Sequence, residues 1–135
     1  MTPLGSDPGP RYRHHYSIAE ATGLLPLVGR WLHEMRILRQ DVARLDERLA
    51  ELRHEFGDQG GTRANEWTQA VVGLARMSLE FRRRDLVIED LDRGLVGFPA
   101  IMAGREVLLS WEEGDESIGY WKELGPGHHG REKMT

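Results

Sequence analysis

A single row of apolar residues constrains this chain more than any other feature of its sequence. Ten apolar side chains recur from residue 24 to residue 56 at alternating spacings of four and three. They are Leu24, Val28, Trp31, Met35, Leu38, Val42, Leu45, Leu49, Leu52 and Phe56. An unbroken heptad row of this length is typical of a helix that packs along one stripe against another helix. The residues between them are mostly charged, which predicts a solvated outer face.

Local signals indicate where this helix begins and ends. Ser17 and Glu20 fit a capping box, in which the Ser hydroxyl and the Glu carboxylate each accept a hydrogen bond from a backbone N–H. Pro26 suits a first helical turn or kinks a helix, so we expect a short capped turn from Ser17 and a straight helix from about Leu25. The glycine-rich run 57–61 predicts the turn to a second helix.

The second helix is expected over 62–84, with one apolar face. Its residues are Trp67, Val71, Leu74, Ser78 and Phe81. This helix is shorter than the first, so an antiparallel hairpin leaves about two turns of the first helix uncovered near residues 24–31. Either the C-terminal part of the chain or a second copy must cover that apolar stretch. Sustained heptads in a short hairpin favour a homodimer with a four-helix arrangement.

After Arg84 the periodicity changes from that of a helix to that of strands. Short β-rich runs occupy residues 86–88, 95–100, 106–111 and 117–121, and Gly/Asp-containing turns separate them. Val107, Leu109 and Trp111 are expected to share one face, with Ile118 and Tyr120 meeting them from the next strand. Pro99 suits an edge strand or a strand end. The predicted fold class is α+β: a long, coiled-coil-like antiparallel helical hairpin followed by an antiparallel β-meander of three or four strands.

Composition limits the classes of function. The 135 residues include no cysteine, which excludes disulfides and thiolate metal sites, and carry a formal net charge of −4. That charge disfavours nucleic acid as a partner, and the only basic run, Arg82-Arg83-Arg84, ends a helix, where cations are favoured anyway. The longest apolar run, Leu24–Val28, is too short for a membrane span. We expect a cytoplasmic protein with a flexible segment at 1–15, one domain at 16–124 and a flexible tail at 125–135.

Several stretches of the sequence resemble one known family. They are Arg11-Tyr12, Leu24–Val28, Asp90–Ala100, Gly104–Trp111, Ile118–Leu124 and Gly130-Arg131. Together they resemble an uncharacterised bacterial family, the domain of unknown function DUF2203, and they cover most of the chain. The resemblance implies no established activity. The family tends to have Asp where Gly97 stands and His where Lys122 stands, so a metal or acid–base site built on those two positions would be lost here.

The candidate ligand-binding residues belong to the strand region. They are Asp90, Asp92, Arg93, Arg105, Glu106, Trp111, Trp121, Lys122 and Arg131. The carboxylates of Asp90, Asp92 and Glu106 could hold a divalent metal through oxygen ligands or do acid–base work. The alternative is structural: Asp92-Arg93-Gly94 forms a turn, Arg105 and Glu106 form an exposed pair, and the tryptophans belong to the core. The histidines lack the spacing and support of metal ligands.

These observations favour a non-enzymatic interaction or scaffold protein that assembles through its helical hairpin as a homodimer and presents its sheet to an unknown protein partner. No sequence motif of a nucleophile, a dinucleotide site or a required cofactor is present. The alternative is a domain that binds a small ligand or a divalent metal, possible also as an enzyme, through the acidic and Arg residues of the meander.

Overall fold

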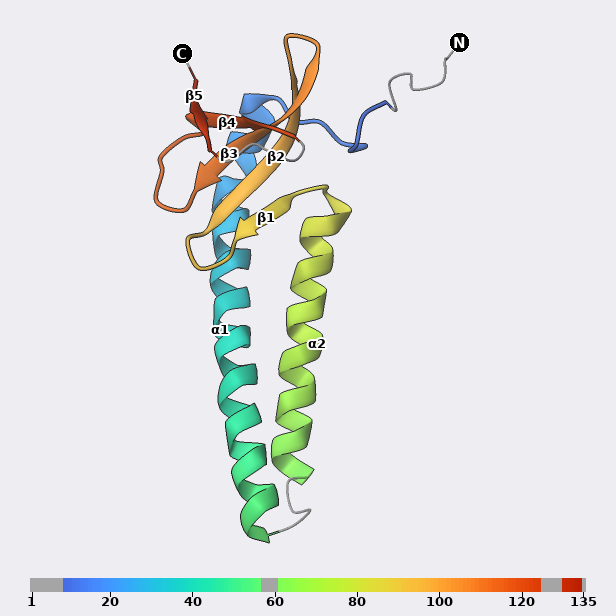
Figure 1. Cartoon of the computed structure of the whole chain (residues 1–135), viewed down its shortest axis with the longest axis vertical. Coiled ribbons are helices and arrows are strands. Elements are labelled where there is room, and N and C mark those ends of the chain that lie inside the picture. Colours follow the sequence, from blue (N-terminus) through green and yellow to red (C-terminus); the bar gives the residue numbers. More distant parts are fainter. Residues whose placement is uncertain (1–8, 57–60, 125–129, 135) are drawn as a thin grey trace.

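A computed structural model describes residues 9–56, 61–124 and 130–134, with the side chains of 53–56 and 62 left out. Two helices form a long hairpin and a sheet lies at one end of it, beside the first part of α1 (Figure 1). The elements are α1 (Ile18–Phe56), α2 (Gly61–Arg83), β1 (Val87–Asp90), β2 (Leu95–Met102), β3 (Arg105–Glu112), β4 (Tyr120–Glu123) and β5 (Glu132–Lys133). The predicted α+β fold is confirmed.

The start of α1 confirms the capping box and corrects the expected break at the proline. Ser17 Oγ accepts a hydrogen bond from the Glu20 N–H at 3.0 Å, and Glu20 Oε1 accepts one from the Ser17 N–H at 2.8 Å. The helix then runs unbroken from Ile18, with Pro26 inside it. Pro26 and Thr22 are both exposed, so water can satisfy the Thr22 carbonyl that Pro26 leaves without its usual donor.

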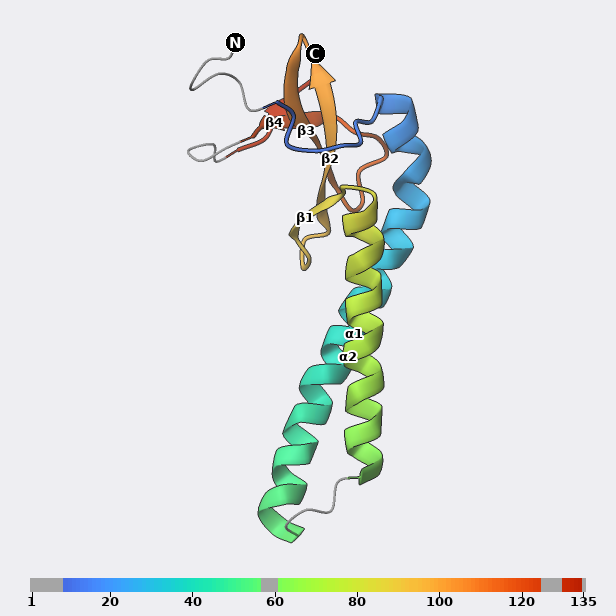
Figure 2. The same ribbon diagram turned by 90° about the vertical axis from the view of Figure 1, so that its right-hand side faces the viewer.

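The ribbons of the two helices cross in the view of Figure 2. None of the nine row residues from Leu24 to Leu52 is exposed. The side chain of Phe56 and residues 57–60 of the predicted turn lie outside the described part. Away from the sheet, over 37–52 and 63–79, only Leu45 and Ala70 are fully buried. The other row residues there are half-buried, because only one helix covers each of them.

The five described strands form a single antiparallel meander in the order β1-β2-β3-β4-β5. Pro99 lies in the part of β2 that does not pair with β1, where its missing N–H costs no hydrogen bond of that ladder. Its carbonyl accepts a hydrogen bond from the Tyr16 N–H at 2.7 Å. The register pairs Leu109 with Trp121 and Ser110 with Tyr120. The expectation that Tyr120 shares a face with Leu109 is therefore wrong by one residue, because Trp121 takes that place.

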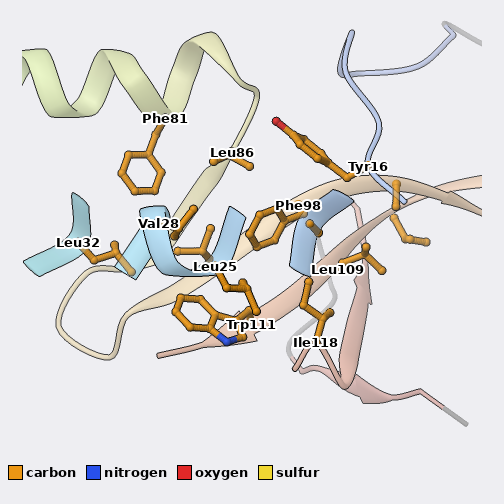
Figure 3. Packing of buried hydrophobic residues seen from close by; sticks show 14 of the residues in the cluster. Tyr16, Leu25, Val28, Leu32, Phe81, Leu86, Phe98, Leu109, Trp111 and Ile118 are labelled. Carbon is orange, nitrogen blue, oxygen red and sulfur yellow. The ribbon is translucent and has the colours of Figure 1, made fainter. Parts of the chain in front are cut away.

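One face of the sheet packs on the first half of α1 and forms the core (Figure 3). Ala21, Leu25, Val28 and Leu32 of α1 meet buried residues of the strands, and Phe81 closes the cluster from α2. The strand residues in this cluster are Val96, Phe98, Ala100, Val107, Leu109 and Trp111. Of the two expected covers for the apolar start of the first helix, the structure shows the sheet.

Parts of the two segments expected to be flexible lie against the sheet. Backbone N–H groups of residues 11–14 donate to side-chain carboxylates of Asp85 and Glu106. At the other end, β5 pairs with Tyr120 and Trp121, a strand that the sequence analysis does not predict. The domain boundaries at 16 and 124 stay predictions. Within the described ranges, neither helix has the length and apolar composition needed to cross a bilayer.

Candidate functional site

The predicted carboxylate cluster does not come together. Asp90 pairs with Leu95, which pairs with Glu112 at one end of β3. Glu106 lies near the other end of β3, about 20 Å along the strand. Within the described residues, no group of three or more His, Asp or Glu side chains is arranged to hold a metal ion. Asp90 and Asp92 belong to one turn, and Glu106 lies apart from both.

Asp90, Asp92 and Arg93 belong to the turn between β1 and β2. Asp90 Oδ1 accepts the Arg93 N–H at 3.1 Å, and Gly94 follows with a φ of +69°. Asp92 pairs with Arg39 of α1, and Arg93 pairs with Glu112 at 2.8 Å. The hydrogen bond from Arg93 lowers the pKa of Glu112 and raises that of Arg93. These residues therefore form a turn, as the structural alternative proposed. The residue that accepts the backbone N–H is Asp90 and not Asp92.

Glu106 anchors the N-terminal segment. Its carboxylate accepts the N–H groups of Arg11 at 2.7 Å and Tyr12 at 3.0 Å, and lies 2.7 Å from His15 Nε2. Burial alone would raise the pKa of Glu106, but these hydrogen bonds outweigh it and lower the pKa. Its neighbour Arg105 is exposed and pairs with Glu123 across the strands. The carboxylate thus holds residues 11–15 on the sheet through three contacts.

The face of the sheet turned away from α1 carries two of the remaining candidates, Lys122 and Arg131. We call the polar side chains of this face the polar face; they are Glu89, Ser110, Glu112, Tyr120, Lys122 and Arg131. Lys122 Nζ lies 2.5 Å from Glu89 Oε1, and the Glu89 side chain is only 11% exposed. β2 and β3 lie between these two residues, a separation of about 14 Å between β1 and β4 in a flat sheet. The pair therefore spans the polar face from one side to the other.

Arg131 covers the other part of the polar face. Its guanidinium lies 4.1 Å from the centre of the Tyr120 ring, and it reaches Glu112 at 3.3 Å and the Ser110 carbonyl at 3.5 Å. Three side-chain atoms of this face are buried and have no hydrogen-bond partner in the described part of the chain: Glu89 Oε2, Ser110 Oγ and Arg131 Nε. Ser110 is completely buried. Unpaired buried polar atoms are rare and costly, so this face is a candidate for binding.

The remaining aromatic and basic candidates have structural partners. Trp111 is buried in the core, and its Nε1 donates to the Asp115 carbonyl at 2.9 Å. Trp121 is half-buried against the same core, in agreement with the structural alternative for the tryptophans. In the basic run, Arg84 lies 4.7 Å from the Trp31 ring centre and pairs with Glu80 at 2.8 Å. Arg83 also pairs with Glu80, at 3.3 Å.

Ser110, Glu112, His15 and Glu89 are among the residues of these contacts that were not predicted from the sequence. Ser110 and Glu112 alternate with the buried Leu109 and Trp111, so the period of the strand carries a signal for their face. His15 and Glu89 have no such signal, because each meets its partner over a long separation along the chain.

The second candidate surface is the distal hairpin, which we define as residues 37–52 and 63–79. Its helices extend beyond the sheet (Figure 1). Three large apolar side chains are exposed there: Ile37 by 45%, Val72 by 41% and Leu79 by 50%. These three residues and the half-buried heptad row leave apolar surface of the distal hairpin in contact with water.

Comparisons with known proteins give a family and no function. A family model described as an uncharacterized conserved protein, DUF2203, matches residues 14–134. No curated protein and no solved structure matches the chain.

Proposed function

We propose that the chain, which belongs to the DUF2203 family of uncharacterised conserved proteins, is a non-enzymatic interaction protein. It associates with a second copy of itself through its distal hairpin. One observation carries the proposal: a heptad row continues to Leu52, but away from the sheet only Leu45 and Ala70 are fully buried. When one partner helix leaves a heptad row partly exposed to solvent, a four-helix arrangement can bury the rest of it. A homodimer of this kind would leave two sheets free to meet a further protein.

The mass of the chain in solution tests the proposal. Light scattering is expected to give about twice 15.4 kDa at high concentration and to fall toward the single-chain value on dilution. Ile101→Glu is a suitable control, because Ile101 is 51% exposed on β2 and lies outside the hairpin. Its mass should equal that of the parent chain. A parent chain that stays at 15.4 kDa at the highest attainable concentration would refute the proposal.

The unpaired atoms of the polar face support a second candidate function, the binding of a small polar ligand. In the form of this candidate that binds a divalent metal, only Glu89 and Ser110 among these residues could be ligands, because Arg131 is itself a cation. Glu89 Oε2, Ser110 Oγ and Arg131 Nε offer an acceptor, a hydroxyl and a donor. These atoms have almost no exposed surface, so a ligand must displace the groups that cover them. Thermal melts with Mg²⁺, Mn²⁺ and Zn²⁺ test the metal form of this proposal. A rise in melting temperature that Ser110→Ala abolishes would support it, and unchanged melts would remove it.

A further inference from the structure

The side of α2 that faces away from α1 carries a second row of small and apolar residues. The members of this outer row are Ala64, Thr68, Val71, Val72, Ala75 and Leu79. None of them is charged, and all except Val71 are exposed. At about 100° per residue, the row lies about 120° around the helix from Leu74 and Phe81, which belong to the face turned toward α1. α2 therefore has two faces rich in apolar residues, and α1 covers one of them.

The outer row is open to solvent. Figure 2 shows α2 from the side away from α1, and along the distal hairpin nothing in the described part of the chain lies in front of it. Val72 is 41% exposed and Leu79 50%. The Thr68 hydroxyl donates to the Ala64 carbonyl at 2.9 Å, so the polar group of this side chain already has a partner within the helix. The row therefore carries no polar side-chain group that covering would leave unpaired.

The other sides of the distal hairpin are more polar. The side of α1 that faces away from α2 carries Gln40, Glu47 and Glu51, all of them exposed. Charged side chains of both helices form ion pairs within the chain, which are Asp41–Arg44, Arg48–Glu51 and Arg63–Glu66. Solvated charges that are already paired give little attraction for a second copy. The outer row holds two of the three large apolar side chains exposed on the distal hairpin, so association is expected to bury this row.

We infer that the outer row packs against the outer row of a second copy of the chain, with the two α2 helices antiparallel. The inference rests on the proposed self-association and names its surface and its orientation. The row is symmetric about the point between Val71 and Val72, because residues 64 and 79 are equally far from that point, and so are residues 68 and 75. A two-fold axis there maps the row onto itself, as an interface between two identical chains requires.

Side-chain size and charge favour the antiparallel arrangement. It sets Leu79 of each copy against Ala64 of the other, a large side chain beside a small one, as close packing requires. A parallel arrangement would set Leu79 against Leu79 and leave a gap between the two Ala64 residues. Arg82, which is exposed three residues after Leu79, continues the row. The parallel arrangement would bring the two Arg82 side chains together, whereas the antiparallel one keeps them about 31 Å apart along the helices.

The first test locates the surface. Leu79→Glu puts a carboxylate into the outer row, and we expect it to raise the dissociation constant measured by sedimentation equilibrium by about tenfold or more. Ile37→Glu is the matched control, because Ile37 is 45% exposed on α1 and lies outside the proposed contact, and we expect a change below about twofold. Circular dichroism checks that both variants stay helical. A dimer that Leu79→Glu leaves intact, or that Ile37→Glu weakens equally, would overturn the outer row as the surface while the proposed self-association would stand.

The second test reads the orientation, and the absence of native cysteine makes it direct. In the antiparallel pair, residue 68 of one copy meets residue 75 of the other. An equimolar mixture of Thr68→Cys and Ala75→Cys chains should therefore form a disulfide-linked mixed dimer. Either variant alone should stay largely unlinked, because its two introduced thiols lie about 10 Å apart along the helices.

The other outcomes of the cross-linking test separate the claims. In a parallel pair each residue meets its own copy, so each variant would link to itself and the mixture would give no mixed dimer. That result would overturn the antiparallel orientation. The absence of linking in every sample of a chain that still dimerises would overturn the surface. A monomeric parent chain would refute the inference and the proposed function together.

Discussion

At the scale of single residues, Glu106 connects the N-terminal segment to the sheet. Its carboxylate binds two backbone N–H groups and His15, and so attaches residues 11–15 to β3. The anionic form makes these bonds, and the pKa of Glu106 lies below its ordinary value of 4.5. As pH falls, the unfolded chain takes up this proton before the folded chain does. The stabilisation is therefore complete above pH 4.5 and is lost as pH falls through the lower folded pKa.

Glu106→Gln tests this attachment. The amide keeps one acceptor oxygen and loses the charge, so we expect a loss of about 1–3 kcal/mol in the free energy of unfolding near neutral pH. The difference between parent and variant should shrink as the medium is acidified below the ordinary carboxyl pKa, because the parent then loses the same anion. Urea titrations over a pH series measure it, with the exposed Glu116→Gln as control. A gap between parent and variant that does not change with pH would contradict the assignment.

Lys122 and Glu89 form one of the most buried ion pairs in the described structure, and its loss should be costly. Lys122→Met leaves the Glu89 carboxylate, 11% exposed, without its cation. We expect the variant to lose about 3 kcal/mol of unfolding free energy, and the double variant Glu89→Leu, Lys122→Met to recover much of it. Arg105→Met breaks the exposed pair with Glu123 and should cost less than about 1 kcal/mol. Equal losses for Lys122→Met and Arg105→Met in chemical denaturation would show that the pair is not effectively buried.

Residue-level features could be predicted where the partners lie close along the chain. The capping box of Ser17 and Glu20 and the turn at Gly94 each depend on a few consecutive residues, and their spacing is visible in the sequence. The proposed meeting of Asp90, Asp92 and Glu106 depended on how strand ends align. That alignment is decided by register and packing over long separations, which one sequence does not reveal.

At the scale of elements, the periodic patterns predicted the existence of both helices and of four strands. The error at Pro26 came from treating the proline as a helix boundary, whereas capping at Ser17 and burial of Ala21, Leu25 and Val28 against the sheet hold the first turns of α1 in place. Tertiary packing here outweighs a local helix-breaking signal. The two-residue β5 is too short for a pattern, so the sequence offers no signal for it.

Because α1 continues through Pro26, the variant Pro26→Ala tests how much the proline destabilises this helix. Alanine restores the N–H that can bond to the Thr22 carbonyl and has a higher helix propensity, so we expect the variant to be more stable by about 1–3 kcal/mol. Thermal unfolding followed by circular dichroism measures the change. Gly23→Ala nearby, with no atom within 4 Å of its added Cβ, gives the gain from propensity alone, about 1 kcal/mol. A Pro26→Ala variant less stable than its parent would mean that the proline is required at this site.

At the scale of the whole molecule, the chain divides its apolar surface unevenly between its two ends. At the sheet end, α1, α2 and the strands enclose a single core that includes Val28, Leu32, Phe81 and Phe98. In the distal hairpin two helices have only each other, and the heptad row stays half-buried. The sequence predicted both the hairpin and the need to cover its row. It could not show which stretch the sheet covers, because that depends on the packing of strands distant in the chain.

Amide hydrogen exchange at two protein concentrations tests the central claim, that a second copy completes the distal hairpin. If it does, exchange across residues 38–52 and 63–77 should slow as concentration rises through the dimerisation range, because association stabilises the helices there. Exchange of β2 and β3, which the proposed interface does not touch, should stay the same. Distal-hairpin exchange that is equally fast at both concentrations, in a chain that otherwise folds as described, would contradict the claim.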